Sequence, residues 1–165
     1  MEDVSTALAA SRAAVDELAA AVTRAASSWT VPRAPGKWSP SQIVEHVARA
    51  LEESANVVSG APSKFPTFPG FVRPVVRTLF FRRVLKKGAF PKARTTRPFR
   101  PESGPTTPVE GRRRLEDAHT KFDRACRART ARQTIDSTLF GAVSVEDYVR
   151  FQELHTRHHR KQIPG

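Results

Sequence analysis

Three histidines have the types and spacing needed to hold a metal ion. His155 and His159 lie four residues apart in LHTRHHRKQI, and His46 lies more than one hundred residues upstream in WSPSQIVEHVARAL. On an α-helix, residues i and i+4 share a face, so this pair can direct two imidazoles at one ion while a second helix supplies the third. The sequence therefore indicates a site for a divalent metal between two helices.

Four segments with helical character are available to position these side chains. The first is rich in alanine, the residue with the best intrinsic helix propensity, and its larger apolar residues repeat at helical spacing. Segments rich in proline and glycine interrupt the chain between helices. We expect helices at about residues 3–28, 40–58, 108–131 and 145–162.

The second and third of these helices begin with strong capping signals. Ser39 is a suitable N-cap, Pro40 suits the first helical position, and Gln42 completes a capping box. The same pattern recurs where Thr107 is followed at the third position by Glu110. Both boxes predict where a helix starts, and the first fixes the beginning of the helix that carries His46.

The elements together predict an all-α protein, a four-helix bundle formed by a single domain over residues 1–165. The last helix has a weaker start signal, because Ser144 is followed at the third position by Asp147. Residues 133–139 are the one segment where a strand competes with these assignments. Residues 59–106 form a basic, proline-rich insertion in the crossover between the second and third helices.

The crossover is strongly basic. It has no acidic residue between Glu53 and Glu102, and it supplies most of the net charge of +12. Apolar residues at near-helical spacing predict a short amphipathic helix over residues 71–87, with Pro74 in its first turn. The segment 71–100 is a candidate anion-binding surface for nucleic acid, anionic lipid or an acidic substrate. A solvated basic face is the favoured interpretation, because charge runs of this kind are common.

The first residues, the apolar runs and the cysteine content of the sequence are typical of a cytoplasmic protein. The first residues carry acids where a signal peptide carries bases, and no apolar run approaches the length of about 20 residues that a membrane span requires. The single cysteine, Cys126, cannot form an internal disulfide, which fits a reducing compartment. We therefore expect a cytoplasmic protein without a membrane span.

Four motifs of the sequence are shared with a known group of proteins. They are GKWSPSQIVEHV at residues 36–47, LFG at 139–141, VSVEDY at 143–148 and HTRHHRKQ at 155–162. The first contains a tryptophan and His46, and the last has the form HxxxHRxQ. Together with the order of the expected helices, these motifs resemble the DinB/YfiT-like superfamily of metal-binding four-helix bundles. The motifs at 139–148 resemble a DinB-like branch of unassigned function.

The resemblance implies a three-histidine site for zinc, nickel or a similar divalent ion, with His46, His155 and His159 as ligands. It also implies a small-molecule substrate and one of two activities, a transferase that uses a low-molecular-weight thiol or a hydrolase. Three imidazoles leave a coordination position open, where the pKa of a zinc-bound water can fall to about 7 and a thiol would be deprotonated. Either reaction is compatible with such a site.

Five further residues are candidates for supporting roles around the ligands. Tyr148 and Gln152 lie on the same helical stripe as the histidine pair, and Gln162 can orient a ligand by accepting its second ring N–H. Arg160 can pair with an acid on a neighbouring helix or attract an anionic substrate. His119 is a candidate fourth ligand or proton carrier, although the resemblance assigns it no role.

Three other residues are expected to lie outside the chemistry. His158 is one residue from His159, or about 100 degrees around the helix, so it should point away from the shared face. Cys126 falls on an apolar helical stripe and is interpreted as a small buried hydrophobe. Trp38 is interpreted as an anchor at the end of the bundle.

A non-enzymatic protein is the alternative to an enzyme. In that case the metal is structural or absent, and the segment 71–100 binds nucleic acid or an anionic surface. A structural zinc site is normally closed by four protein ligands, often including cysteine, and this chain has one poorly placed cysteine. The enzyme is therefore favoured, and self-association as a homodimer is left open.

Overall fold

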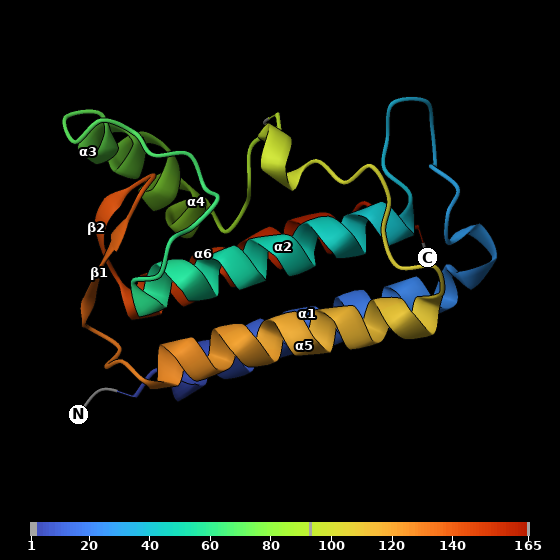
Figure 1. Cartoon of the computed structure of the whole chain (residues 1–165), viewed down its shortest axis with the longest axis horizontal. Helices are drawn as coiled ribbons and strands as arrows, with labels where there is room; N and C mark the ends of the chain where they lie inside the picture. The colour runs from blue at the N-terminus through green and yellow to red at the C-terminus, as the bar shows by residue number, and fades with distance from the viewer. Residues whose placement is uncertain (1–2, 93, 165) are drawn as a thin grey trace.

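Four long helices form a bundle in the computed structural model of the chain, which describes residues 3–92 and 94–164 (Figure 1). Around the bundle, α1 packs against α5, α5 against α2, α2 against α6, and α6 against α1. The predicted all-α, four-helix fold is confirmed. The four helices are α1 (Ser5–Arg24), α2 (Pro40–Ser59), α5 (Pro108–Arg127) and α6 (Val145–Arg160).

The directions of the helices explain the long crossover. In Figure 1, α2 and α5 run side by side in the same direction, whereas α6 runs opposite to α2. Parallel neighbours cannot be joined by a short turn, so residues 60–107 must return the chain to the end where α2 began. The antiparallel pair α2 and α6 has a much smaller interface than α2 and α5.

The predicted capping boxes are present at both helices. The Ser39 hydroxyl accepts a hydrogen bond from the Gln42 N–H at 3.3 Å, and the Gln42 side-chain oxygen accepts one from the Ser39 N–H at 2.9 Å. Thr107 and Glu110 make the same reciprocal pair at the start of α5. These bonds satisfy N–H groups that the first turn of a helix leaves without partners.

A small β-hairpin joins α5 to α6, in the region where the sequence showed only a weak strand signal. Strands β1 (Thr134–Ser137) and β2 (Gly141–Ser144) pair antiparallel. Two N–H groups of the first turn of α6, from Val145 and Glu146, donate to the carbonyls of Gln133 and Ala131. The segment after α5 is thereby held against the start of α6, which explains why α5 ends before the expected position.

The core and an ion-pair network join α2 to α5. Leu51 and Phe122 are almost completely buried. At the edge of this interface, the Arg114 guanidinium of α5 pairs with the carboxylates of Glu45 and Glu52 of α2. Glu45 therefore faces α5, although it adjoins His46 in the sequence.

None of the described helices combines the length and apolar character needed to cross a membrane.

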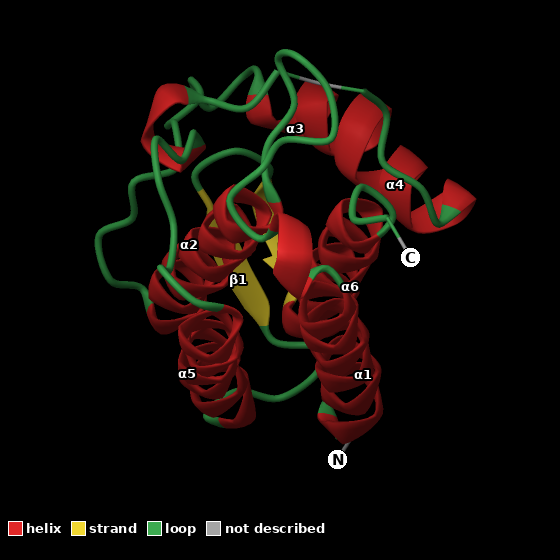
Figure 2. Ribbon diagram, turned by 90° about the vertical axis from the view of Figure 1, so that its right-hand side faces the viewer, coloured by secondary structure: helices red, strands yellow, loops and turns green. Residues whose placement is uncertain are grey.

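The amphipathic helix predicted in the crossover is present over residues 73–87. It consists of α3 (Arg73–Val76), the π-helical turn η2 (Arg77–Phe81) and α4 (Arg82–Lys87), and we call it the crossover helix. Its buried residues are Phe81 and Val84, and the Phe81 ring packs 4.9 Å from that of Phe151 on α6. Figure 2 shows the helix on the outside of the bundle, beside α6.

The end of the crossover is bound tightly to the start of α2. The Pro105 carbonyl accepts hydrogen bonds from the Trp29 indole N–H at 2.9 Å and from the Ser41 hydroxyl at 2.7 Å. Gly104 lies so close to the Ser41 backbone that a Cβ at this position would overlap it. The side-chain amide of Gln42 also donates to the Pro101 carbonyl. The return path of the crossover is thus anchored beside the helix that carries His46.

Candidate metal centre

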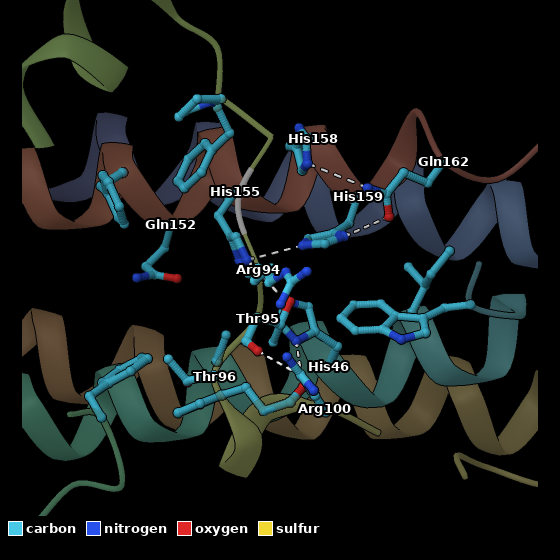
Figure 3. Close-up of a pocket in the computed structure, with 18 of the residues that line it drawn as sticks. His46, Arg94, Thr95, Thr96, Arg100, Gln152, His155, His158, His159 and Gln162 are labelled. Carbon is cyan, nitrogen blue, oxygen red and sulfur yellow. Dashed lines mark hydrogen bonds between the residues drawn. The ribbon is translucent and has the colours of Figure 1, made fainter. Parts of the chain in front are cut away.

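The antiparallel packing of α2 and α6 brings the beginning of one helix to the end of the other. His46 lies in the second turn of α2, and His155 and His159 lie in the last two turns of α6. Figure 3 shows the three imidazoles pointing toward one another across the gap between these helices. One ring nitrogen from each lies within 4.8 Å of the other two, so the structure brings the three predicted ligands together.

The distances between ring nitrogens suit a tetrahedral metal ion. His155 Nε2 lies 3.1 Å from His46 Nε2 and 3.1 Å from His159 Nε2. Ligands at the zinc–nitrogen distance of 2.0–2.1 Å in tetrahedral geometry are separated by about 3.3 Å. The two separations that involve His155 are thus close to this value, and the separation of the other two nitrogens, which is no more than 4.8 Å, can adjust as a metal ion binds.

Hydrogen bonds on the opposite ring nitrogens orient two of the imidazoles. His46 Nδ1 lies 2.8 Å from the main-chain carbonyl of Phe99, and His159 Nδ1 lies 2.9 Å from the side-chain oxygen of Gln162. Because a carbonyl oxygen can only accept, both Nδ1 atoms carry a proton and donate. The Nε2 lone pairs of both rings are then available to a metal, and Gln162 has the position expected of a residue that orients a ligand histidine.

The two short contacts between Nε2 atoms cannot both be hydrogen bonds, because the three neutral rings have only one N–H group left to supply a donor for them. With His46 and His159 each protonated on Nδ1, both of their Nε2 atoms are acceptors, and a neutral His155 can donate to only one of them. The remaining contact would bring two lone pairs together. A divalent cation between the three nitrogens removes this repulsion, and imidazole is a ligand that suits zinc and nickel. The donor set therefore fits a divalent metal.

Burial keeps all three rings in the neutral, ligand-competent form at neutral pH. Desolvation lowers the pKa of His46, lowers that of His155 well below its ordinary value, and lowers that of His159 to about 3. The three rings also disfavour one another's protonation, because each would place a positive charge beside the next. Protons therefore compete weakly with a metal for this site.

The histidines lie at one side of a pocket of about 630 Å³ between α2, α6 and the crossover. Its walls are largely aromatic, and its lining carries four cationic side chains. Among the described residues, the pocket lining includes no aspartate, glutamate, cysteine or serine. The aromatic residues are Trp38, Phe65, Phe68, Phe80, Phe90, Phe99, Phe140 and Phe151, and the cations are Arg33, Lys37, Arg94 and Arg100.

The supporting candidates divide into residues that line the pocket and residues that do not. Gln152 and Gln162 line it, and the buried Gln152 side-chain oxygen has no hydrogen-bond partner in the described chain. Tyr148 lies elsewhere in the core, with its hydroxyl 3.3 Å from that of Ser54. Arg160 donates to the Ile163 carbonyl at the end of α6. The structure thus brings only the two glutamines of this set to the pocket.

His119 and Cys126 lie on α5, outside the histidine cluster. His119 is almost completely buried, its Nε2 has no hydrogen-bond partner among the described residues, and burial lowers its pKa. Burial raises the pKa of the Cys126 thiol to about 12, as expected for a small apolar core residue. The pocket lining contains neither residue. The side chain of His158 points away from the other three rings in Figure 3, although it remains part of the lining.

Two aromatic neighbours of the cluster were not predicted to contact the histidines. The Trp38 ring packs 4.9 Å from that of His46 and 6.0 Å from that of His159, so this residue shields the ligands in addition to closing the bundle end. The Phe90 ring, from the crossover, lies 5.4 Å from that of His155. The position of Trp38 two residues before the helix start was a usable signal, whereas Phe90 lies in irregular chain without periodicity.

The metal-free protein is expected to lose stability as the pH falls from about 6.5 toward 3. Histidines of the unfolded chain bind protons near pH 6.5, whereas burial holds the pKa of His159 at about 3 and lowers those of His46 and His155. The unfolded state then binds more protons, so the free energy of unfolding decreases with falling pH in this window. Urea unfolding in the presence of a chelator at several pH values measures this slope, and a flat profile would contradict it.

Replacing Gln162 by leucine is expected to weaken metal binding by about 10–100-fold, because His159 loses the acceptor that orients it. The variant Gln162→Glu keeps an acceptor oxygen and should retain the affinity. Competition with a chromogenic chelator compares the two dissociation constants. Equal affinities for the leucine and glutamate variants would show that this contact does not support the ligand.

Nearly the whole sequence matches a known protein family. The family model of the DinB superfamily matches residues 7–163, which include all four helices of the bundle except the first residues of α1, and all three clustered histidines. Among curated proteins and solved structures, none matches the chain. The extent of the family match, together with the helical bundle, shows that the chain belongs to the DinB superfamily.

Proposed function

We propose that this protein is a divalent-metal-dependent enzyme that acts on a small molecule. The observation that supports the proposal is the position of the three histidines, which converge at a pocket instead of inside a closed core. The described part of the chain places no fourth His, Cys, Asp or Glu in the cluster. Three protein ligands with an open position are typical of catalytic zinc sites, whereas structural sites usually have four.

The reactive group is expected to come from the metal site and not from a side chain. When bound, a zinc or nickel ion acts as a Lewis acid and lowers the pKa of a coordinated thiol or water. The deprotonated form is then available at neutral pH. The described lining offers no carboxylate, serine or cysteine that would act as a nucleophile. The protein residues then hold the ligand imidazoles, exclude bulk water with aromatic walls, and orient the substrate.

The lining of the pocket favours a substrate with an anionic group and an apolar body. Arg33, Lys37, Arg94 and Arg100 place positive charge around the pocket without an acidic residue among its described lining. The aromatic walls suit an apolar body, and a pocket of about 630 Å³ holds a molecule of metabolite or drug size. In Figure 3 the Gln152 amide points into the space between the helices, where its free oxygen can accept a hydrogen bond from the substrate.

Two reactions fit this site. In a transferase, the metal would supply an activated low-molecular-weight thiol, and the pocket residues would hold the substrate beside it. In a hydrolase, activated water would take the same place. A cytoplasmic location belongs to the proposal, because cellular thiols are kept reduced there.

Replacement of the native ion by cobalt(II) tests the open position and separates the two reactions. Addition of a thiol such as glutathione or cysteine to the cobalt protein should produce a thiolate-to-metal charge-transfer band if the enzyme is a transferase. A hydrolase should show no such band, but its visible cobalt spectrum should change as bound water ionises with rising pH. A spectrum that responds to neither thiol nor pH would indicate a closed, structural site and would overturn the proposal.

A further inference from the structure

The outer face of the crossover helix carries large apolar side chains that nothing in the described chain covers. Val75 and Leu79 of this helix are 53% and 68% exposed, although its inner face is packed through Phe81 and Val84. They are spaced by four and therefore share one side of the helix. Phe71, which is 82% exposed, precedes Val75 by the same spacing but lies in the turn before the helix. We call the three residues the apolar stripe. Contiguous exposed apolar side chains on a protein surface commonly mark a binding face.

Beyond Leu79, the exposed residues on the same side of the helix are positively charged. Arg82, Arg83 and Lys86 are exposed and follow Leu79 at helical spacing. In the parts of the chain that the structure describes, none of these three cations has an ion-pair or hydrogen-bond partner. The sequence has no acidic residue between Glu53 and Glu102 to neutralise them. The outer face is therefore apolar at its beginning and cationic at its end.

We infer that the outer face of the crossover helix docks onto the surface of an anionic phospholipid membrane. The apolar stripe enters the boundary between headgroups and acyl chains, and the cations at the end of the helix contact the headgroup phosphates. Figures 1 and 2 place the crossover helix on the outside of the bundle, so a flat surface can approach it. The interaction is separate from the metal ligands and does not depend on the proposed reaction.

The combination of the stripe with the cations favours a membrane over nucleic acid. A phosphodiester backbone would engage Arg82, Arg83 and Lys86 but would leave Phe71 and Leu79 exposed to water. A membrane interface offers an anionic layer above an apolar one, which matches both halves of the face. The charge also disfavours an identical face on a second copy of the chain, because cations brought close together would repel one another.

Co-sedimentation of the metal-loaded, full-length protein with phospholipid vesicles tests this inference. The protein should bind phosphatidylcholine vesicles that contain phosphatidylserine, should bind pure phosphatidylcholine much less, and should be released by salt. Leu79→Ser and Phe71→Ser should each lower the vesicle affinity by about tenfold, because they remove an inserted apolar group. Arg82→Gln should lower it by roughly fivefold.

Val109→Ser is the matched control, because Val109 is 78% exposed but lies at the start of α5, outside the crossover helix. Its vesicle affinity should equal that of the unmodified protein. The metal content of every variant should stay unchanged, which shows that the bundle and the histidine site are intact.

Three results would overturn the inference. In the first, Phe71→Ser and Leu79→Ser bind the anionic vesicles as well as the control does. In the second, the protein binds duplex DNA with an affinity that the serine variants retain, while vesicle binding is absent. In the third, the protein self-associates through a contact that Leu79→Ser abolishes, again without vesicle binding. The second result would assign the face to nucleic acid and the third to another copy of the chain.

Discussion

The variant His155→Ala is expected to contain only traces of divalent metal, whereas the unmodified protein binds about one ion per chain. His155 is the ligand whose Nε2 contacts both other rings, so its removal leaves two imidazoles that face an empty space. Loss of an outer hydrogen bond to a ligand typically costs about 10–100-fold in affinity, and loss of a ligand should cost more. Elemental analysis after dialysis against zinc or nickel measures the difference.

Two other histidines provide controls for this experiment. His158 adjoins the pair in the sequence but points away from the shared centre, and His119 is buried on α5 outside the cluster. The variants His158→Ala and His119→Ala should both keep their metal. Equal metal content in His155→Ala and the unmodified protein would refute the proposed site, and metal loss in His119→Ala would indicate a fourth ligand.

The variant Gly111→Ala is expected to lower the free energy of unfolding by about 1–3 kcal/mol, although alanine is the better helix former. Gly111 lies in the first turns of α5, where a Cβ would fall 2.5 Å from the Trp29 ring. Trp29 cannot move aside easily, because it is buried and its indole donates to the Pro105 carbonyl. The close approach therefore outweighs the gain of about 1 kcal/mol that helix propensity alone would predict.

Urea unfolding of two glycine variants measures this balance. A methyl group at Gly70 would have no neighbouring atom within 4 Å, and the backbone there is not in the left-handed region. The variant Gly70→Ala should therefore change stability by less than about 0.5 kcal/mol. A more stable Gly111→Ala protein would show that helix α5 and Trp29 are less closely packed than described.

The bundle could be predicted largely because its determinants are local. Each capping box lies within four residues of sequence, and helical periodicity reports which side of a helix is buried. The hairpin between α5 and α6 was harder to predict, because its strands contain only four residues each, and only β1 alternates between exposed and buried residues. Its position depends on long-range contacts of Ala131 and Gln133 with the start of α6.

The candidate site was predictable where its geometry follows from one helix. The spacing of His155 and His159 defines a shared face, and Gln162, three residues beyond His159, lies within reach of that ring. The assignment of His46 as the third ligand was strengthened by the resemblance to known sequences, because the relative direction of two distant helices is not encoded in local spacing. The pocket walls formed by Phe65, Phe90 and other crossover residues could not be inferred, since irregular chain carries no periodic signal.

The hydrogen bond from His46 to the Phe99 carbonyl does not depend on which side chain occupies position 99. It orients His46 through the main chain, so substitution of the Phe99 side chain does not remove the acceptor. The sequence of the crossover is therefore free to change wherever the backbone still returns to the same place at residue 99. In the proposed enzyme, the pocket wall can therefore change its substrate preference while the three histidines and their hydrogen bonds stay the same.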